Sequence, residues 1–178
     1  MTCNGVGREI PEKIGNYTCR PYTDIFGTAP EVKPVVSQRS LRLVKPGETK
    51  LLPTLKDAIR AAGLKDGMTI SFHHCFREGD MVIGQVLTAI RELGIKGLRF
   101  APSAVINIER PSIVDFVKDG TINRIEASGI RGRLGDAVID GLMDNPVILR
   151  PHGARPRAIE AGELTIDVAF IGASSADV

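Results

Sequence analysis

All three histidines of the chain lie in loops that follow apolar runs of the sequence. His73 and His74 come directly after one such run, and His152 comes shortly after another. The same set of loops carries four arginines, which are Arg77, Arg131, Arg133 and Arg155. Arginine binds carboxylates and phosphates through two parallel hydrogen bonds, and histidine exchanges protons near neutral pH. Together these residue types predict a site for an anion, such as a multiply charged carboxylic acid or a phosphorylated cofactor.

Serine and glycine residues in these loops add hydrogen-bonding groups to the predicted anion site. Glycine lets backbone N–H groups approach an anion closely at the start of a helix. The candidate binding residues are therefore His73, His74, Arg77, Ser103, Ser128, Gly129, Arg131, Gly132 and His152. The alternative for any single arginine is a solvated loop charge, so it is the cluster as a whole that favours a function.

Two sharper motifs are present but do not meet the requirements of their chemistry. Residues 129–135 read Gly-x-x-Gly-x-x-Gly rather than Gly-x-Gly-x-x-Gly, which argues against a nicotinamide cofactor. His73, His74 and Cys75 are consecutive, so they cannot easily ligate one ion, and no acidic pair accompanies them. We therefore predict no metal in this chain. Cys75 beside His74 is a conceivable nucleophile, although sequence neighbours rarely adopt the geometry of a catalytic pair.

Strands and helices that alternate along the chain must position these loops. Apolar runs predict strands at 68–72, 97–101, 122–127, 147–150 and 166–171. Helical spacing predicts helices that begin at 53, 81 and 112, a helix over 134–142 and a short one through 158–161. Alternation of this kind predicts an α/β fold with a mainly parallel open sheet and helices on both faces. The loops after the strands then lie at one edge, where ligands bind in such sheets.

Residues 1–50 differ from the rest of the chain. Proline and glycine punctuate them, and neither helical nor strand periodicity persists. We expect an extended, irregular N-terminal arm over 1–50, with one short edge strand within 32–44, and an α/β domain over 51–178.

Composition excludes several classes of function. The chain has 178 residues, of which 43% are hydrophobic and 25% charged, and its net charge of +2 gives no strong electrostatic case for nucleic acid or membrane. Its three cysteines are far apart, which argues against a disulfide framework and fits a reducing compartment. No apolar run near the N-terminus reads as a signal peptide or membrane span, so we expect a cytoplasmic protein.

Several separate motifs carry a family resemblance. They are Gly-Leu-Lys-Asp-Gly-Met-Thr-Ile-Ser-Phe-His-His at 63–74, Ser-Gly-Ile-Arg-Gly at 128–132, His-Gly at 152–153, and Gly-Glu-Leu-Thr-Ile-Asp-Val-Ala-Phe-Ile-Gly at 162–172. In this order they strongly resemble the alpha subunit of citrate lyase, over roughly 51–178. That subunit is similar to the wider CoA-transferase family, which has an acidic-glycine turn, an apolar strand and a Gly-Gly-Phe loop. Asp66-Gly67 matches the turn, and His73-His74 replaces the paired glycines, as is typical of the citrate lyase branch.

The resemblance implies a CoA-transferase-like N-terminal domain and a reaction. An acyl-carrier thioester would pass from acetate to citrate, giving a citryl thioester and acetate, and a beta subunit would then cleave the citryl thioester to oxaloacetate. The implied cofactor is a CoA-type thioester carried by the acyl carrier (gamma) subunit. The implied partners are the beta and gamma subunits, citrate and acetate, with a homo-oligomer inside the complex.

The resemblance also implies that this chain lacks the catalytic glutamate of the family. In the family two similar α/β halves form one subunit, and the catalytic glutamate, which forms anhydride and glutamyl-thioester intermediates, lies in the second half. None of the following matches its motif: Glu78, Glu109, Glu126, Glu160 and Glu163. The catalytic residue is therefore unknown in this chain, which we expect to be an N-terminal fragment that is inactive alone.

Two other functions stay open on the sequence. One is a non-catalytic α/β module that binds a carboxylate or a sugar phosphate, although residues 1–50 show no helix-turn-helix pattern that would join it to DNA. The other is a structural subunit of a lyase assembly. Ligand binding without turnover would favour the first, and co-purification with a carrier protein and a beta subunit would favour the second.

Overall fold

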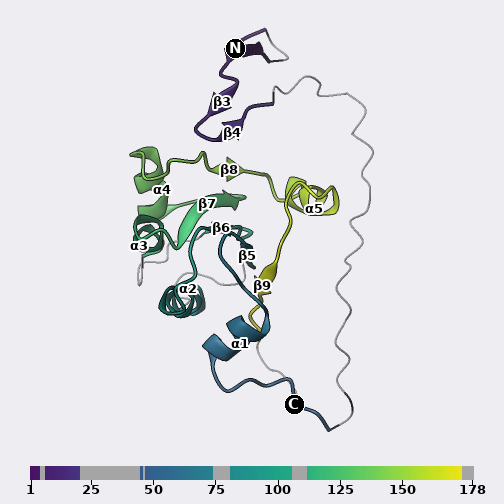
Figure 1. The fold of residues 1–178 in the computed structure, drawn as a ribbon. Coiled ribbons are helices and arrows are strands. Elements are labelled where there is room, and N and C mark those ends of the chain that lie inside the picture. The colour runs from purple at the N-terminus through teal and green to yellow at the C-terminus, as the bar shows by residue number, and fades with distance from the viewer. Residues whose placement is uncertain (5–6, 21–44, 46, 74–80, 106–111, 174–178) are drawn as a thin grey trace.

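The structure, a computed structural model, describes residues 1–4, 7–20, 45, 47–73, 81–105 and 112–173. Its centre is a five-stranded sheet in the order β8-β7-β6-β5-β9, in which every pair of neighbours is parallel (Figure 1). The strands are β5 (Thr69–Phe72), β6 (Leu98–Phe100), β7 (Ile122–Ala127), β8 (Ile148–Leu149) and β9 (Val168–Phe170). All five agree with predicted runs, and β7 has the predicted bounds. The α/β class with a parallel sheet is confirmed.

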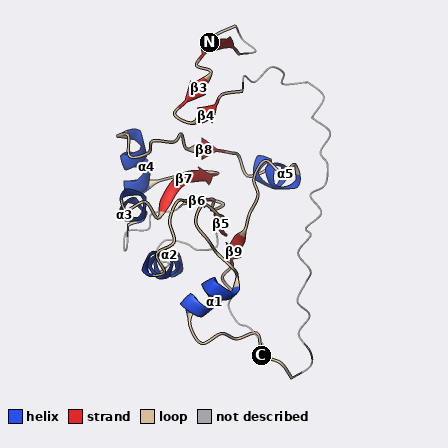
Figure 2. Cartoon of the chain, in the orientation of Figure 1, coloured by secondary structure: helices blue, strands red, loops and turns tan. Residues whose placement is uncertain are grey.

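The order of the strands determines which face each helix covers. The helices are α1 (Leu55–Ala61), α2 (Val82–Glu92), α3 (Ile113–Lys118), α4 (Gly132–Ile139) and α5 (Ala154–Glu160). From β5 to β8 each new strand is added on the same side, so right-handed crossovers put α2, α3 and α4 on one face. The connection from β8 to β9 runs back across the sheet and therefore puts α5 on the other face. Figures 1 and 2 show these positions, which confirm the prediction of helices on both faces.

The two faces of the sheet differ in chemistry. The face under α2 to α4 is apolar and holds the core, in which the ring centroids of Phe72 and Phe100 lie 5.6 Å apart and those of Phe72 and Phe170 5.1 Å apart. The opposite face carries the alternate strand positions, which are polar. We call it the polar face and define it by Thr69, Ser71, Arg99, Arg124 and Glu126.

A glycine with positive φ follows each helix of the described chain. After α1, Gly63 has φ +73°, and the next amide, of Leu64, donates to the carbonyl of Ile59 at 3.3 Å. This left-handed residue turns the chain sharply and satisfies carbonyls at the helix end. The other glycines in this role are Gly94, Gly120, Gly141 and Gly162. The sequence-predicted helix ends are therefore mostly correct.

The N-terminal region contains structure that the sequence did not predict. Residues 1–20 form two small antiparallel hairpins, β1 (Thr2–Cys3) with β2 (Glu9–Ile10) and β3 (Lys13–Ile14) with β4 (Tyr17–Thr18). The expectation of an irregular arm was wrong here, because strands of two residues are too short to leave a periodic pattern. The predicted edge strand within 32–44 lies outside the described residues. No helix in the described ranges is long and apolar enough to cross a membrane.

Candidate functional site at the carboxyl edge of the sheet

The predicted site residues that the structure describes lie where strands end. His73 comes directly after β5, Ser103 follows β6, Ser128 comes directly after β7, and His152 follows β8. Because these strands are parallel, their carboxyl ends lie at one edge of the sheet. His74 and Arg77 lie outside the described residues.

Ser103 and Ser128 are joined through their backbones just beyond the ends of β6 and β7. The amide of Ser103 donates to the carbonyl of Phe72 at 3.0 Å, and the amide of Ser128 donates to the carbonyl of Ser103 at 3.0 Å. The parallel pairing thus continues past the assigned strands. It holds the two serines side by side at the centre of the edge.

The hydroxyl groups of these two serines have an unusual environment. Ser103 is only 7% exposed, and the Oγ atoms of Ser103 and Ser128 are both buried without a hydrogen-bond partner among the described residues. Burying a hydroxyl without a partner costs about 1–3 kcal/mol, so such groups are rare in folded proteins. Two such hydroxyls at the ends of adjacent strands indicate a binding site in which a ligand supplies the missing hydrogen-bond partner.

The connection from β7 to α4 brings further polar groups to the same edge. The amide of Val105 donates to the carbonyl of Gly129 at 3.0 Å, which ties this connection to the end of β6. Arg131 occupies the N-cap position of α4, its side chain is exposed, and it makes no capping hydrogen bond. Gly132 begins the helix with φ +60°. Arg131 and the first amides of α4 therefore follow Ser128 closely in the chain.

The two described histidines lie on connections at opposite sides of the two serines. His73 and His152 are both exposed, on connections that follow β5 and β8. Those strands are three positions apart in the sheet, so the two connections begin about 14 Å from one another. The connection with His73 begins one strand position from the end of β6, which leads to Ser103. The connection with His152 begins one strand position from the end of β7, which leads to Ser128.

Arg155 is held by the protein itself. Its guanidinium donates to the carbonyls of Ala101 at 2.8 Å and Pro102 at 3.3 Å, and to Ser71 Oγ at 2.9 Å. Burial lowers the pKa of Arg155, and the charge of Glu126 opposes this effect. The prediction that Arg155 grips an anion is therefore replaced by a structural role, in which it fastens α5 to the polar face.

The polar face carries a charged network that the sequence did not predict. Arg150 Nε donates to Glu126 Oε1 at 2.6 Å, and Arg150 also donates to Glu163 at 3.1 Å. Arg157 donates to the other oxygen of Glu163 at 3.0 Å. Burial by itself would lower the pKa of Arg150, but the hydrogen bond and charge of Glu126 outweigh it and raise that pKa. The signal was present in β7, where polar residues occupy alternate positions.

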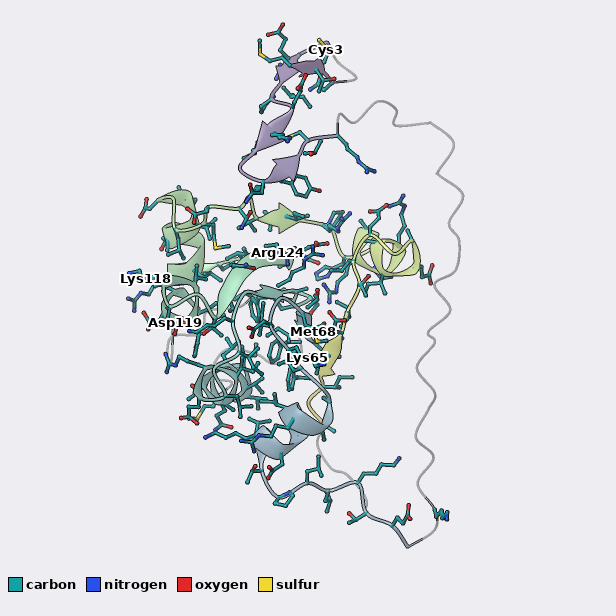
Figure 3. The ribbon with its side chains drawn as sticks, in the orientation of Figure 1. Cys3, Lys65, Met68, Lys118, Asp119 and Arg124 are labelled. Carbon is teal, nitrogen blue, oxygen red and sulfur yellow. The ribbon has the colours of Figure 1, made fainter. Side chains whose placement is uncertain are left out.

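The same face contains a pocket of about 140 Å³ beneath the β3–β4 hairpin. It is lined by Asn16, Tyr17, Arg99, Arg124, Ile125, Glu126, Asn145, Pro146 and Ile148. Figure 3 shows Arg124 on the side of β7 away from Lys118 and Asp119, which end α3. The described residues contain no group of three or more His, Cys, Asp or Glu side chains arranged to hold a metal ion.

Comparison with known proteins places the chain in a family. The sequence model of the citrate lyase alpha subunit family matches residues 48–178. The chain belongs to this family. The curated citrate lyase alpha chains of Klebsiella pneumoniae and Haemophilus influenzae are each 45% identical over 130 residues, which is 73% of this chain and 25% or 26% of theirs. That of Escherichia coli is 42% identical over 133 residues, 75% of this chain and 26% of its own. The chain therefore spans about a quarter of the length of these relatives.

A solved structure of the citrate lyase alpha family has the same fold. It is described as the alpha subunit of citrate lyase from Streptococcus mutans in complex with citrate. It is 44% identical, superposes with a TM-score of 0.82, and covers 96% of this chain and 32% of its own. Every predicted site residue, from His73 to His152, lies within the part of the chain that the family model matches.

Proposed function

We propose that this chain provides the citrate-binding part of the transferase site of a citrate lyase alpha subunit. The reaction would exchange acetate for citrate on an acyl-carrier thioester, so that the acyl-carrier thiol leaves acetate and becomes joined to a citrate carboxyl group. Family membership supports the activity, and the solved relative, which is described as a complex with citrate, supports the substrate.

The observation that carries the proposal is the pair of buried, unpartnered hydroxyls of Ser103 and Ser128. Each can donate one hydrogen bond to a carboxylate oxygen, and the two lie on neighbouring strand ends. Arg131, exposed at the start of α4, would add charge, and the first amides of that helix would add donors. Citrate, which carries several carboxylates, matches a site that offers donors from two strands and a helix.

Three of the described glutamates are held in ion pairs, which argues against a covalent role for them. Glu126 is 2% exposed and bonded to Arg150, Glu163 is bonded to Arg150 and Arg157, and Glu92 is paired with Lys56 at 2.6 Å. A carboxylate held by guanidinium or ammonium groups is a poor nucleophile, because attack would require breaking those bonds. We propose that the attacking carboxylate is none of these three. Glu78 and Glu109 lie outside the described residues.

The proposal includes the assembly that the family implies. The thioester would be of the CoA type and carried by an acyl carrier (gamma) subunit, and a beta subunit would cleave the product. The alpha subunit would act as a homo-oligomer within this complex. Co-purification of the full-length subunit with carrier and beta subunits tests this part.

Citrate binding by the chain is the direct test, measured by isothermal titration calorimetry. We expect Ser103→Ala with Ser128→Ala, and separately Arg131→Ala, to weaken citrate binding roughly tenfold. Arg8→Gln, which removes an exposed charge in the N-terminal hairpins, is the matched control and should leave binding unchanged. In a complete subunit Arg131→Ala should raise the Michaelis constant for citrate. Citrate binding that is indifferent to all three site substitutions would contradict the proposal.

A further inference from the structure

The pocket on the polar face contains two arginines that have no partner in the described chain. Arg99 and Arg124 are half-buried, and neither guanidinium makes a hydrogen bond or ion pair with a described residue. They are register partners on β6 and β7, so their backbones lie about 4.8 Å apart and their side chains leave the sheet on the same side. Two like charges this close, partly removed from water, repel one another.

The other charges nearby do not neutralise this pair. Glu126 also lines the pocket, but its carboxylate is bonded to Arg150 at 2.6 Å. Arg150 and Arg157 together balance Glu126 and Glu163, and the four are joined by hydrogen bonds. That network is electrically neutral as a whole. The charge that remains at the pocket is the two positive charges of Arg99 and Arg124.

The remaining lining suits a small polar ligand. Asn16 and Asn145 contribute amide groups and Tyr17 a phenol, each of which can donate a hydrogen bond, while Pro146 and Ile148 form an apolar wall. The volume is about 140 Å³, and a water molecule in the liquid occupies about 30 Å³. The pocket therefore has room for a group with the size of phosphate or a small dicarboxylate.

We propose that this pocket is a binding site for a small dianion, held by the paired guanidinium groups of Arg99 and Arg124. Two arginines can each form two parallel hydrogen bonds to a phosphoryl or carboxylate group, and a dianion would cancel the residual charge. None of Ser103, Ser128 or Arg131 lines this pocket, so the inference does not rest on the proposed citrate site. The β3–β4 hairpin supplies Asn16 and Tyr17 and thereby closes one side of the pocket.

The test is a nuclear magnetic resonance titration of the chain with inorganic phosphate and, separately, with succinate. The signals observed are the arginine Nε–Hε groups, and Arg99→Lys and Arg124→Lys assign them because lysine has no such group. We expect saturable shifts of these two signals, with a dissociation constant below about 10 mM for at least one probe. Binding of phosphate alone identifies a phosphoryl ligand, and binding of succinate alone a dicarboxylate. No saturable shift with either probe would overturn the proposal.

Substitutions test the assignment of the site. Arg99→Gln with Arg124→Gln should weaken binding of the probe by roughly tenfold or more, while Arg8→Gln should leave it unchanged. Arg99→Lys and Arg124→Lys keep the positive charge but lose the planar guanidinium group, and each should weaken binding of the probe several-fold. These two variants provide the test if the double glutamine variant does not fold. If citrate binding depends on Ser103 and Ser128 but not on Arg99 and Arg124, the citrate site and the dianion pocket are separate sites. If the folded variant with both Arg99→Gln and Arg124→Gln binds the probe as tightly as the wild type, the two arginines do not form the proposed dianion site.

Discussion

Arg155 Nη2 donates to the carbonyl oxygen of Ala101 at 2.8 Å, and this bond joins α5 to the end of the neighbouring β6 strand across the polar face. The same guanidinium reaches Pro102 and Ser71, so one side chain spans two adjacent strands of the sheet. Since α5 is the described helix on this face, its position depends strongly on that side chain. The buried apolar cluster of Ala101, Ala158 and Leu164 adds packing contacts between α5 and the end of β6.

Removing the Arg155 side chain should therefore loosen α5. We expect Arg155→Ala to lower the free energy of unfolding by about 2–3 kcal/mol, because it leaves two backbone carbonyls and a serine hydroxyl without their donor. In a chain of this size that corresponds to a fall in Tm of roughly 4–12 °C, measurable by calorimetry. Arg133→Ala, on the exposed side of α4, is the control and should change Tm little. Equal effects of the two substitutions would contradict the assignment.

Ser103→Ala and Ser128→Ala should separate stability from binding. Each removes a buried hydroxyl that has no partner in the described chain, so the folded protein loses an unfavourable group and its stability should stay equal or rise by about 1 kcal/mol. The same substitutions should weaken citrate binding, as proposed above. Urea unfolding measures the first effect and calorimetric titration the second. A clear loss of stability in either variant would mean that the hydroxyl has a structural partner.

The apolar runs of the sequence predict the strands because the parallel sheet buries one continuous apolar face. The period-two runs around Phe72, Phe100 and Ile125 are the direct signature of that burial. The edge that carries His73, Ser103, Ser128 and His152 followed from the same alternation, since parallel strands end on one side. The order of the strands did not follow, because the return from β8 to β9 across the sheet leaves no local signal.

The contacts of the arginines were beyond sequence reasoning. Arg131 and Arg155 look alike in the sequence, as arginines in loops after strands, yet one is exposed at a helix start and the other is bonded to Ala101. Arg99 and Arg124 lie inside the predicted strands at 97–101 and 122–127. Only their pairing in register shows that two unpartnered charges meet on one face. Such pairs depend on which strands are neighbours, and therefore on tertiary structure.

Asp119, which ends α3, should make stability depend on pH at the acid end. Burial would raise its pKa, but hydrogen bonds from the Thr121 hydroxyl and amide and the charge of Lys96 outweigh it, so the pKa lies below the ordinary 3.8. The ionised form is thus favoured in the folded state. Its stabilisation is present above about pH 4 and is lost as the pH falls through the folded pKa.

We expect Asp119→Asn to lower the free energy of unfolding at pH 7 by about 0.5–1 kcal/mol, a modest value because the carboxylate is a third exposed. Below the folded pKa the difference between variant and wild type should disappear. Asp140→Asn is the matched control, because Asp140 ends α4 in the same way and precedes a glycine of positive φ. Urea unfolding between pH 2 and pH 7 measures both. A difference for Asp119→Asn that does not change with pH would exclude the ionic contribution.

Gly15 allows the β3–β4 hairpin to pack closely against the α/β domain. Its φ is +56°, and a Cβ placed there would lie 2.7 Å from the carbonyl oxygen of Asp144, which belongs to the chain before β8. Gly15→Ala would therefore combine backbone strain with a collision against backbone, and the hairpin must move away. Gly7→Ala is a close control, because Gly7 also has positive φ at +75° but nothing within 4 Å of such a Cβ.

We expect Gly15→Ala to release the hairpin while the sheet and its helices remain folded. Trypsin should then cleave after Lys13 several-fold faster than in Gly7→Ala, with little change in the main thermal transition. Because Asn16 and Tyr17 line the pocket with Arg99 and Arg124, release of the hairpin should also weaken dianion binding there. Cleavage at the same rate in the two variants would show that the close approach of Gly15 to Asp144 does not determine whether the hairpin stays packed on the domain.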